Sequence, residues 1–194
     1  MLASEALRVC VELGRLLDEL GVPYLVGGSL ASSLYGVPRS TQDADLVADL
    51  QEEHVANFVE ALAERFYVDE ERVRHAVQRR SSFNVLELAT MFKVDVFVAG
   101  GGKLDREQMK RRERLELPEG SGELDLASAE DTILQKLRWY ELGHRVSDRQ
   151  WRDVLEVLEV QGDRLDREYL HRGADILGVS ELLTRALDET GFDE

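Results

Sequence analysis

The 194-residue sequence predicts an α+β protein, with a core of strands and helices over residues 1–127 and a helical domain over residues 128–194. Three observations predict this organisation. Short β-forming segments alternate with amphipathic helical segments in the first part of the chain. A glycine-rich turn, Gly100–Gly102, is expected to end the sheet. Beyond residue 127 every apolar pattern has helical spacing.

The individual elements follow from local apolar spacing and from capping residues. Helices are expected over residues 4–20, 29–35, 51–64, 128–143, 147–158, 165–177 and 182–187. Ser128 and Ser147 are expected to be the N-caps of two of them. Strands are expected over residues 24–26, 41–50, 66–68, 83–88 and 92–98. The last two of these strands are separated by three residues, which predicts a hairpin.

Acidic residues lie within two of the predicted strands. Asp43 and Asp45 are two positions apart, so their side chains are expected on one face of the strand. Asp95 alternates with Val94 and Val96, so it is expected on the face away from the core if the valines face inward. Carboxylate oxygens are the ligands that Mg²⁺ and Mn²⁺ prefer. We therefore predict that Asp43, Asp45 and Asp95 bind a metal and are catalytic, with Asp95 as third ligand or as the group that orients an acceptor hydroxyl.

A second motif, Gly27-Gly28-Ser29, lies where the first short strand meets a helix. Glycines let the backbone approach a phosphate closely, and a helix start supplies free N–H groups next to the serine hydroxyl. Taken alone, this motif is equally consistent with an ordinary turn, and the Asp-Ala-Asp motif with a solvated strand edge in an acid-rich chain. The combination favours a transferase that takes a nucleoside monophosphate from an NTP.

Composition limits the partners. The chain has 24 Lys+Arg and 39 Asp+Glu, a formal charge of −15, so an extended nucleic-acid surface is not expected. Two arginine- and lysine-rich clusters, at residues 72–80 and 110–114, are interpreted as solvated helix faces and helix C-termini in preference to a local RNA contact. No apolar segment is long enough to span a bilayer, which predicts a cytoplasmic protein with no membrane partner.

These motifs, in this order, resemble the nucleotidyltransferase superfamily with its Gly-Ser and Asp-x-Asp signature. The closer resemblance is to bacterial nucleotidyltransferase-like toxins of the abortive-infection (AbiEii-like) type. The segments that carry it are Val26–Ser29, Arg39–Leu46, Phe83–Val85, Val94–Phe97, Glu130–Leu137 and Ser147–Val154. The resemblance implies a mixed β-sheet flanked by helices, with a C-terminal helical domain, and Mg²⁺-dependent use of an NTP.

The resemblance also implies nucleotide contacts by Lys136 and Asp153, with Lys136 offsetting triphosphate charge and Asp153 holding either Lys136 or a neighbouring base. The residues by themselves allow a plainer interpretation, in which Lys136 is solvated and Asp153 pairs with Arg149 one turn earlier. Arg39 and Thr41, just before the acidic strand, are also expected to contact phosphate.

The acceptor of the transferred group is left open by the sequence, among RNA, protein and a small molecule. A tRNA acceptor stays in this set despite the acidic chain, and a cationic aminoglycoside would suit an acidic pocket. The alternative function is a catalytically silent module that binds a nucleotide or a protein partner, such as a component of a toxin–antitoxin system.

Overall fold

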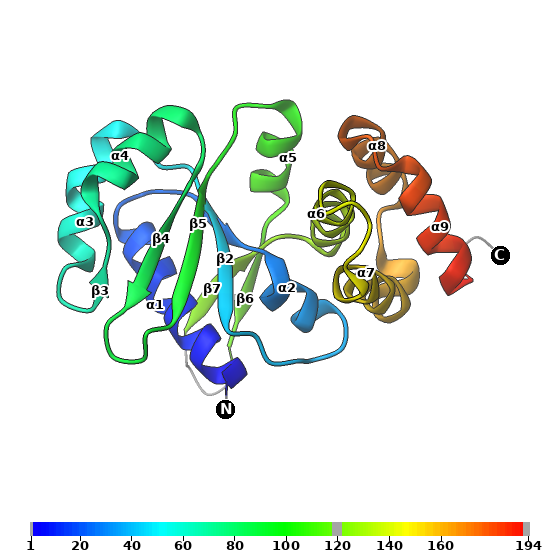
Figure 1. Cartoon of the computed structure of the whole chain (residues 1–194), viewed down its shortest axis with the longest axis horizontal. Helices are drawn as coiled ribbons and strands as arrows, with labels where there is room; N and C mark the ends of the chain where they lie inside the picture. Colours follow the sequence, from blue (N-terminus) through cyan, green and yellow to red (C-terminus); the bar gives the residue numbers. More distant parts are fainter. Residues whose placement is uncertain (1, 118–121, 192–194) are drawn as a thin grey trace. The chain divides into compact units, whose positions relative to one another are not determined.

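The computed structural model describes residues 2–117 and 122–191, and the chain divides into two compact units (Figure 1). The first unit runs up to Leu30 and then from Ser40 to Leu126. The second unit consists of Ala31–Arg39 and of the chain from Ala127 onward. Helix α2, Gly28–Tyr35, therefore begins in the first unit and continues in the second.

The first unit is built on a mixed β-sheet, as the resemblance implied. Seven strands of the described chain form it in the order β3-β4-β5-β2-β1-β7-β6. Their bounds are β1 Tyr24–Val26, β2 Asp43–Ala48, β3 Phe66–Tyr67, β4 Ser82–Glu87, β5 Lys93–Val98, β6 Glu113–Glu116 and β7 Glu123–Leu126. Strands β2 and β5 are parallel, whereas β4 pairs with β5 in the predicted antiparallel hairpin.

Alternation of side chains along β2 and β5 separates a buried face from a more open one. Ala44 and Leu46 on β2, and Val94 and Val96 on β5, are fully buried. The helices of this unit are α1 Leu2–Glu19, α3 Val55–Leu62, α4 Glu70–Arg79 and α5 Lys103–Arg111, with a 3-10 turn at Glu52–His54. Helix α1 packs against β1, β2 and β7, and α4 packs against β4 and β5 (Figure 1). The acids predicted to share one strand face are thus on the side away from these buried residues.

The expectation that the sheet ends at Gly100–Gly102 is wrong. After these glycines the chain forms α5 and then two more strands, and β7 pairs in parallel with β1 through Val26 and Leu126. Local patterns could not predict this, because β6 is mostly exposed and charged and because the partner strand β1 lies about a hundred residues earlier.

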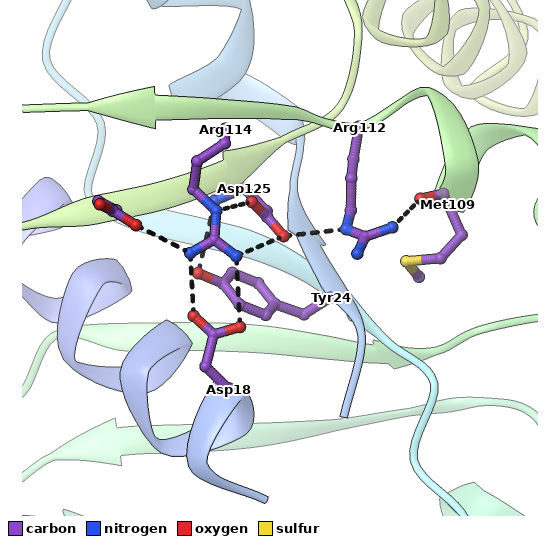
Figure 2. Close-up of polar contacts among 7 residues, drawn as sticks. Asp18, Tyr24, Met109, Arg112, Arg114 and Asp125 are labelled. Atoms are coloured by element: carbon purple, nitrogen blue, oxygen red, sulfur yellow. Dashed lines mark hydrogen bonds and ion pairs between the residues drawn. The ribbon is translucent and has the colours of Figure 1, made fainter. Parts of the chain in front are cut away.

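A network of ion pairs and hydrogen bonds joins the two added strands to helix α1 and to strand β1 (Figure 2). The buried carboxylate of Asp125 on β7 accepts hydrogen bonds from Arg112 Nε at 2.9 Å and from Arg114 Nη2 at 3.3 Å. Arg114 also lies 3.2 Å from Asp18 of α1, and the Asp125 N–H donates to the Tyr24 hydroxyl on β1. Burial raises the pKa of Tyr24 to about 12, so this hydroxyl stays neutral.

The second unit is helical, as the sequence predicts. Its helices are α6 Ala129–Leu142, α7 Asp148–Gln161, α8 Arg167–Leu177 and α9 Ser180–Thr190, with a 3-10 turn at Gly162–Arg164. Both predicted N-caps are present, because Ser128 accepts the N–H of Asp131 and Ser147 accepts that of Gln150. Of the helices in the described residues, none combines the length and the apolar composition needed to cross a bilayer.

Candidate active site

The structure brings together two of the three predicted metal-binding acids by strand register. Asp43 and Asp45 lie on the open face of β2, where Asp43 is exposed and Asp45 is half-buried. In the parallel pairing of β2 with β5, Asp45 is opposite Asp95. Side chains opposite one another on neighbouring strands project from the same face, so the three acids share one face of the sheet. We call this group, Asp43, Asp45 and Asp95, the acidic face.

Asp95 already has two donors. Lys93 Nζ lies 2.7 Å from Asp95 Oδ2, and the Asn84 amide donates to Asp95 Oδ1. Asn84 is opposite Asp95 on β4, and Lys93 is opposite Asp43 on β2. The hydrogen bond to Asp95 raises the pKa of Lys93 against a smaller opposing effect of burial, so the ammonium is charged at neutral pH.

The carboxylates of the acidic face are suitable ligands for Mg²⁺ or Mn²⁺, but their oxygens do not converge on one metal position in this structure. Within residues 2–117 and 122–191, no three histidine, cysteine, aspartate or glutamate side chains form a group that could hold a metal ion. Carboxylate oxygens are the correct ligand type for these hard cations. The chemistry of the residues therefore fits the metal, while their metal-binding role stays a prediction.

Gly28 lies directly against the acidic face. Its φ is +58°, and a Cβ atom at this position would lie 1.8 Å from Asp45 Oδ2. Only glycine both adopts this conformation readily and leaves room for the carboxylate. The N–H of Gly27 donates to the backbone oxygen of Asp45 at 2.9 Å, which fixes the turn to β2. The first turn of α2, including Ser29, is thereby placed next to Asp45.

Thr41, expected to contact phosphate, is engaged with the first acid. Its buried hydroxyl lies 2.8 Å from the backbone oxygen of Asp43 and 3.3 Å from Asp43 Oδ1. This contact orients Asp43 at the start of β2. A phosphate contact by Thr41 stays a prediction.

The other three predicted nucleotide-binding residues meet inside the second unit. Lys136 Nζ of α6 lies 2.6 Å from Asp153 Oδ2 of α7, and the two side chains are only 6% and 4% exposed. Arg39 donates to both oxygens of the same carboxylate, Nε to Oδ1 at 3.0 Å and Nη2 to Oδ2 at 2.9 Å. Lys136 is therefore buried and held by Asp153, and the plainer interpretation of a solvated lysine is wrong. We call Arg39, Lys136 and Asp153 the buried ion cluster.

The buried ion cluster controls the ionisation of its carboxylate. Burial by itself raises the pKa of Asp153, but hydrogen bonds from Arg39 and Lys136 outweigh burial and leave the pKa lowered. Asp153 is thus an anion with two cationic partners. Its side chain is almost completely shielded from water.

Two residues of the acidic face were not predicted from the sequence. Lys93 lies two positions before Asp95, so the same alternation that predicts the face of Asp95 also puts Lys93 there. Asn84 belongs to a segment that carries the family resemblance, but only its pairing across β4 and β5 assigns it a partner.

Comparisons with known proteins agree on the fold. The sequence matches no protein-family model and no curated protein. Among solved structures, an antigenic nucleotidyltransferase-like protein from Paracoccidioides brasiliensis superimposes with a TM-score of 0.55 at 17% identity, over 95% of this chain and 93% of that one. The antibiotic-resistance factor ANT(2'')-Ia superimposes with a TM-score of 0.53 at 17% identity, over 100% of both chains.

A third solved structure, a nucleotidyltransferase-type protein from Thermotoga maritima, superimposes with a TM-score of 0.51 at 18% identity, over 79% of this chain and 96% of that one. At this level of identity the similarity establishes the fold. The chain has the nucleotidyltransferase-like fold, which confirms the predicted α+β class and agrees with the fold that the resemblance implies. The narrower resemblance to AbiEii-like toxins stays a prediction.

Proposed function

We propose that this protein is a Mg²⁺-dependent nucleotidyltransferase that transfers a nucleoside monophosphate from an NTP to an acceptor. The observation that carries the proposal is the acidic face on a sheet of this fold. Asp45 is in register with Asp95, Asp43 lies on the same face, and Gly28 packs against the Asp45 carboxylate. A fold of this class without acids at these positions would not support the proposal.

In the proposed reaction an acceptor oxygen attacks the α-phosphorus of the NTP. A bond forms between these two atoms, the bond from the α-phosphorus to the bridging oxygen breaks, and pyrophosphate leaves. The proton of the acceptor passes to Asp95 or to solvent. Since both oxygens of Asp95 have donors in this structure, Asp95 must exchange one of them before it can orient an acceptor.

Asp43 and Asp45 are the residues that would hold the metal, with Asp95 as the third ligand or as the acceptor-orienting group. When bound there, a divalent cation supplies positive charge opposite the phosphoryl oxygens. Thr41 holds Asp43 in place for this role.

The triphosphate is proposed to bind at Gly27-Gly28-Ser29, through backbone N–H groups at the start of α2 and the serine hydroxyl. Arg39, Thr41, Lys136 and Asp153 are proposed as further nucleotide-binding residues, a role that rests on the resemblance. The net positive charge of the buried ion cluster, two cations and one carboxylate, supports this role because a triphosphate is anionic.

The test is calorimetric titration of the four NTPs, with and without Mg²⁺, into the wild-type protein and into Asp45→Asn. We expect Mg²⁺-dependent binding of at least one NTP, lost in Asp45→Asn. Glu53→Gln is the matched control, because it removes one exposed carboxylate elsewhere in the same unit and should bind as wild type does. Equal binding by wild type and Asp45→Asn would contradict the proposal.

The NTP that binds is then labelled and used to search for the acceptor. Transfer of a labelled monophosphate to an aminoglycoside, to tRNA and to protein separates the three classes. ANT(2'')-Ia, which shares the fold, is described as an antibiotic-resistance factor, and this favours beginning with the cationic small molecules. An acidic chain with a formal charge of −15 suits a cationic acceptor better than a polyanion.

A second candidate is a catalytically silent module that binds a nucleotide or a protein partner, such as a toxin–antitoxin component. The observation that favours it is that both carboxylate oxygens of Asp95 already accept hydrogen bonds, from Lys93 and from Asn84. Bound NTP that survives for hours with all three acceptor classes present would favour this candidate over the transferase.

A further inference from the structure

Lys93 lies among the acids of the acidic face, and no role in the proposed reaction requires it. We propose that Lys93 is an internal counter-ion that holds Asp95 in the metal-free protein and leaves it when a divalent cation binds. In this way Lys93 sets the cation affinity of the acidic face. The inference rests on the proposed function, because it concerns the same metal-binding acids.

The contacts of Lys93 put its charge where a cation would bind. Its Nζ lies 2.7 Å from Asp95 Oδ2, while its backbone is in register with Asp43 on β2. Asp45, the register partner of Asp95, is on the same face. An ammonium and a divalent cation cannot both take Asp95 Oδ2 at ligand distance, since like charges repel at that separation.

The exposure of the pair allows the exchange. The Lys93 side chain is 44% exposed and that of Asp95 is 21% exposed, so the ammonium can move into water without leaving a buried charge. An ion pair exposed to this degree contributes little to folding. Its consequence is electrostatic: it offsets repulsion among three carboxylates when no metal is present.

Asn84 has a different part in the same arrangement. Its amide donates to the other oxygen, Asp95 Oδ1, and carries no charge. It can therefore keep its hydrogen bond to Asp95 when a cation replaces Lys93. Lys93 therefore competes with the cation for Asp95 Oδ2, whereas Asn84 positions the carboxylate through Oδ1.

The experiment titrates Mn²⁺ alone into the nucleotide-free full chain and compares wild type with Lys93→Met, Lys93→Arg and Lys103→Met. We expect Lys93→Met to bind Mn²⁺ about threefold or more tightly than wild type, because a nearby positive charge is removed. Lys93→Arg keeps the charge and should stay within about twofold of wild type. Lys103→Met removes an exposed charge on α5 and should also stay within about twofold.

Thermal unfolding gives a second readout that does not depend on activity. In the absence of metal the melting temperature of Lys93→Met should be no higher than that of wild type, and addition of Mn²⁺ should raise it by more than it raises that of wild type. The difference should shrink at high salt, since the competition is electrostatic.

The possible failures are distinguishable. If wild type and Lys93→Met bind Mn²⁺ equally, or if Lys93→Met binds it more weakly, the role of Lys93 is overturned and the proposed function stands. If Lys93→Arg binds as tightly as Lys93→Met, side-chain shape rather than charge is responsible, and the counter-ion is again overturned. Wild type that binds neither Mn²⁺ nor Mg²⁺-NTP overturns the proposed function, and this inference falls with it.

Discussion

The protein has two groups of predicted functional residues, and the groups differ in the burial and the pairing of their charged side chains. The acidic face of the first unit carries three carboxylates on the open face of two paired strands, and Asp95 among them is paired with the half-exposed Lys93. The buried ion cluster of the second unit has one carboxylate between two cations, and its central pair is almost fully buried. The first arrangement leaves negative charge available to a ligand, whereas in the second the carboxylate is paired with two cations. A loss of stability is therefore expected from removing a carboxylate in the second group and not in the first.

The largest loss of stability is expected from Asp153→Ala. The substitution removes the carboxylate that lies 2.6 Å from the buried Lys136 Nζ, and breaking a buried pair by removing one partner costs about 3–5 kcal/mol. Urea unfolding, followed by circular dichroism, measures the change. Asp188→Ala, an exposed position on α9, is the control and should lie within about 0.5 kcal/mol of wild type. A loss of less than about 1 kcal/mol in Asp153→Ala would show that the cluster is not a structural element.

The next effect is expected at Gly28, where the acidic face and backbone geometry meet. Gly28→Ala forces a Cβ to within 1.8 Å of Asp45 Oδ2 at a φ of +58°, so both strain and a clash must be relieved. We expect a loss of about 1–3 kcal/mol in unfolding free energy and loss of NTP binding. Gly21→Ala is the matched control, because Gly21 has a φ of +68° but no atom within 4 Å of the added Cβ. If the two variants lose unfolding free energy and NTP binding equally, the close approach of residue 28 to Asp45 is not the cause of the effect.

The buried ion cluster also predicts a pH dependence. The pKa of Asp153 is lowered in the folded state, because donors favour its charged form despite burial. A carboxylate of this kind contributes stability above its unfolded pKa of about 3.9, and the contribution is lost as pH falls through the lower folded value. The unfolding free energy of wild type should thus fall more steeply below about pH 4 than that of Asp153→Asn. Parallel curves for the two proteins down to pH 2 would contradict this assignment.

Local sequence patterns were sufficient for the acidic face and insufficient for its partners. Alternation along two short strands predicts the orientation of Asp43, Asp45 and Asp95, because side-chain direction in a strand depends only on position. The register that puts Asp45 beside Asp95, and Asn84 across from it, is a property of the assembled sheet. No local pattern contains that information.

The buried ion cluster shows the same limit more strongly. Helical spacing favours Arg149 as the partner of Asp153, whereas the structure pairs Asp153 with Lys136 on another helix and with Arg39, 114 residues earlier. Only the family resemblance pointed to Lys136. The sheet extension through β7 was missed for the same reason, since its partner β1 is distant in sequence.

The smallest change in stability, and the sharpest contrast between the two groups, is expected from Asp45→Asn. This substitution keeps the shape of the side chain and removes one of several neighbouring negative charges, so repulsion on the acidic face falls and the melting temperature should be unchanged or higher. Asp153→Asn makes the same chemical change in the buried ion cluster, and it should lower the melting temperature because Lys136 loses its anion. Differential scanning calorimetry of both variants in metal-free buffer measures the pair. If Asp45→Asn unfolds at a lower temperature than Asp153→Asn, the acidic face is a structural element, and the division between a binding group and a stabilising group is wrong.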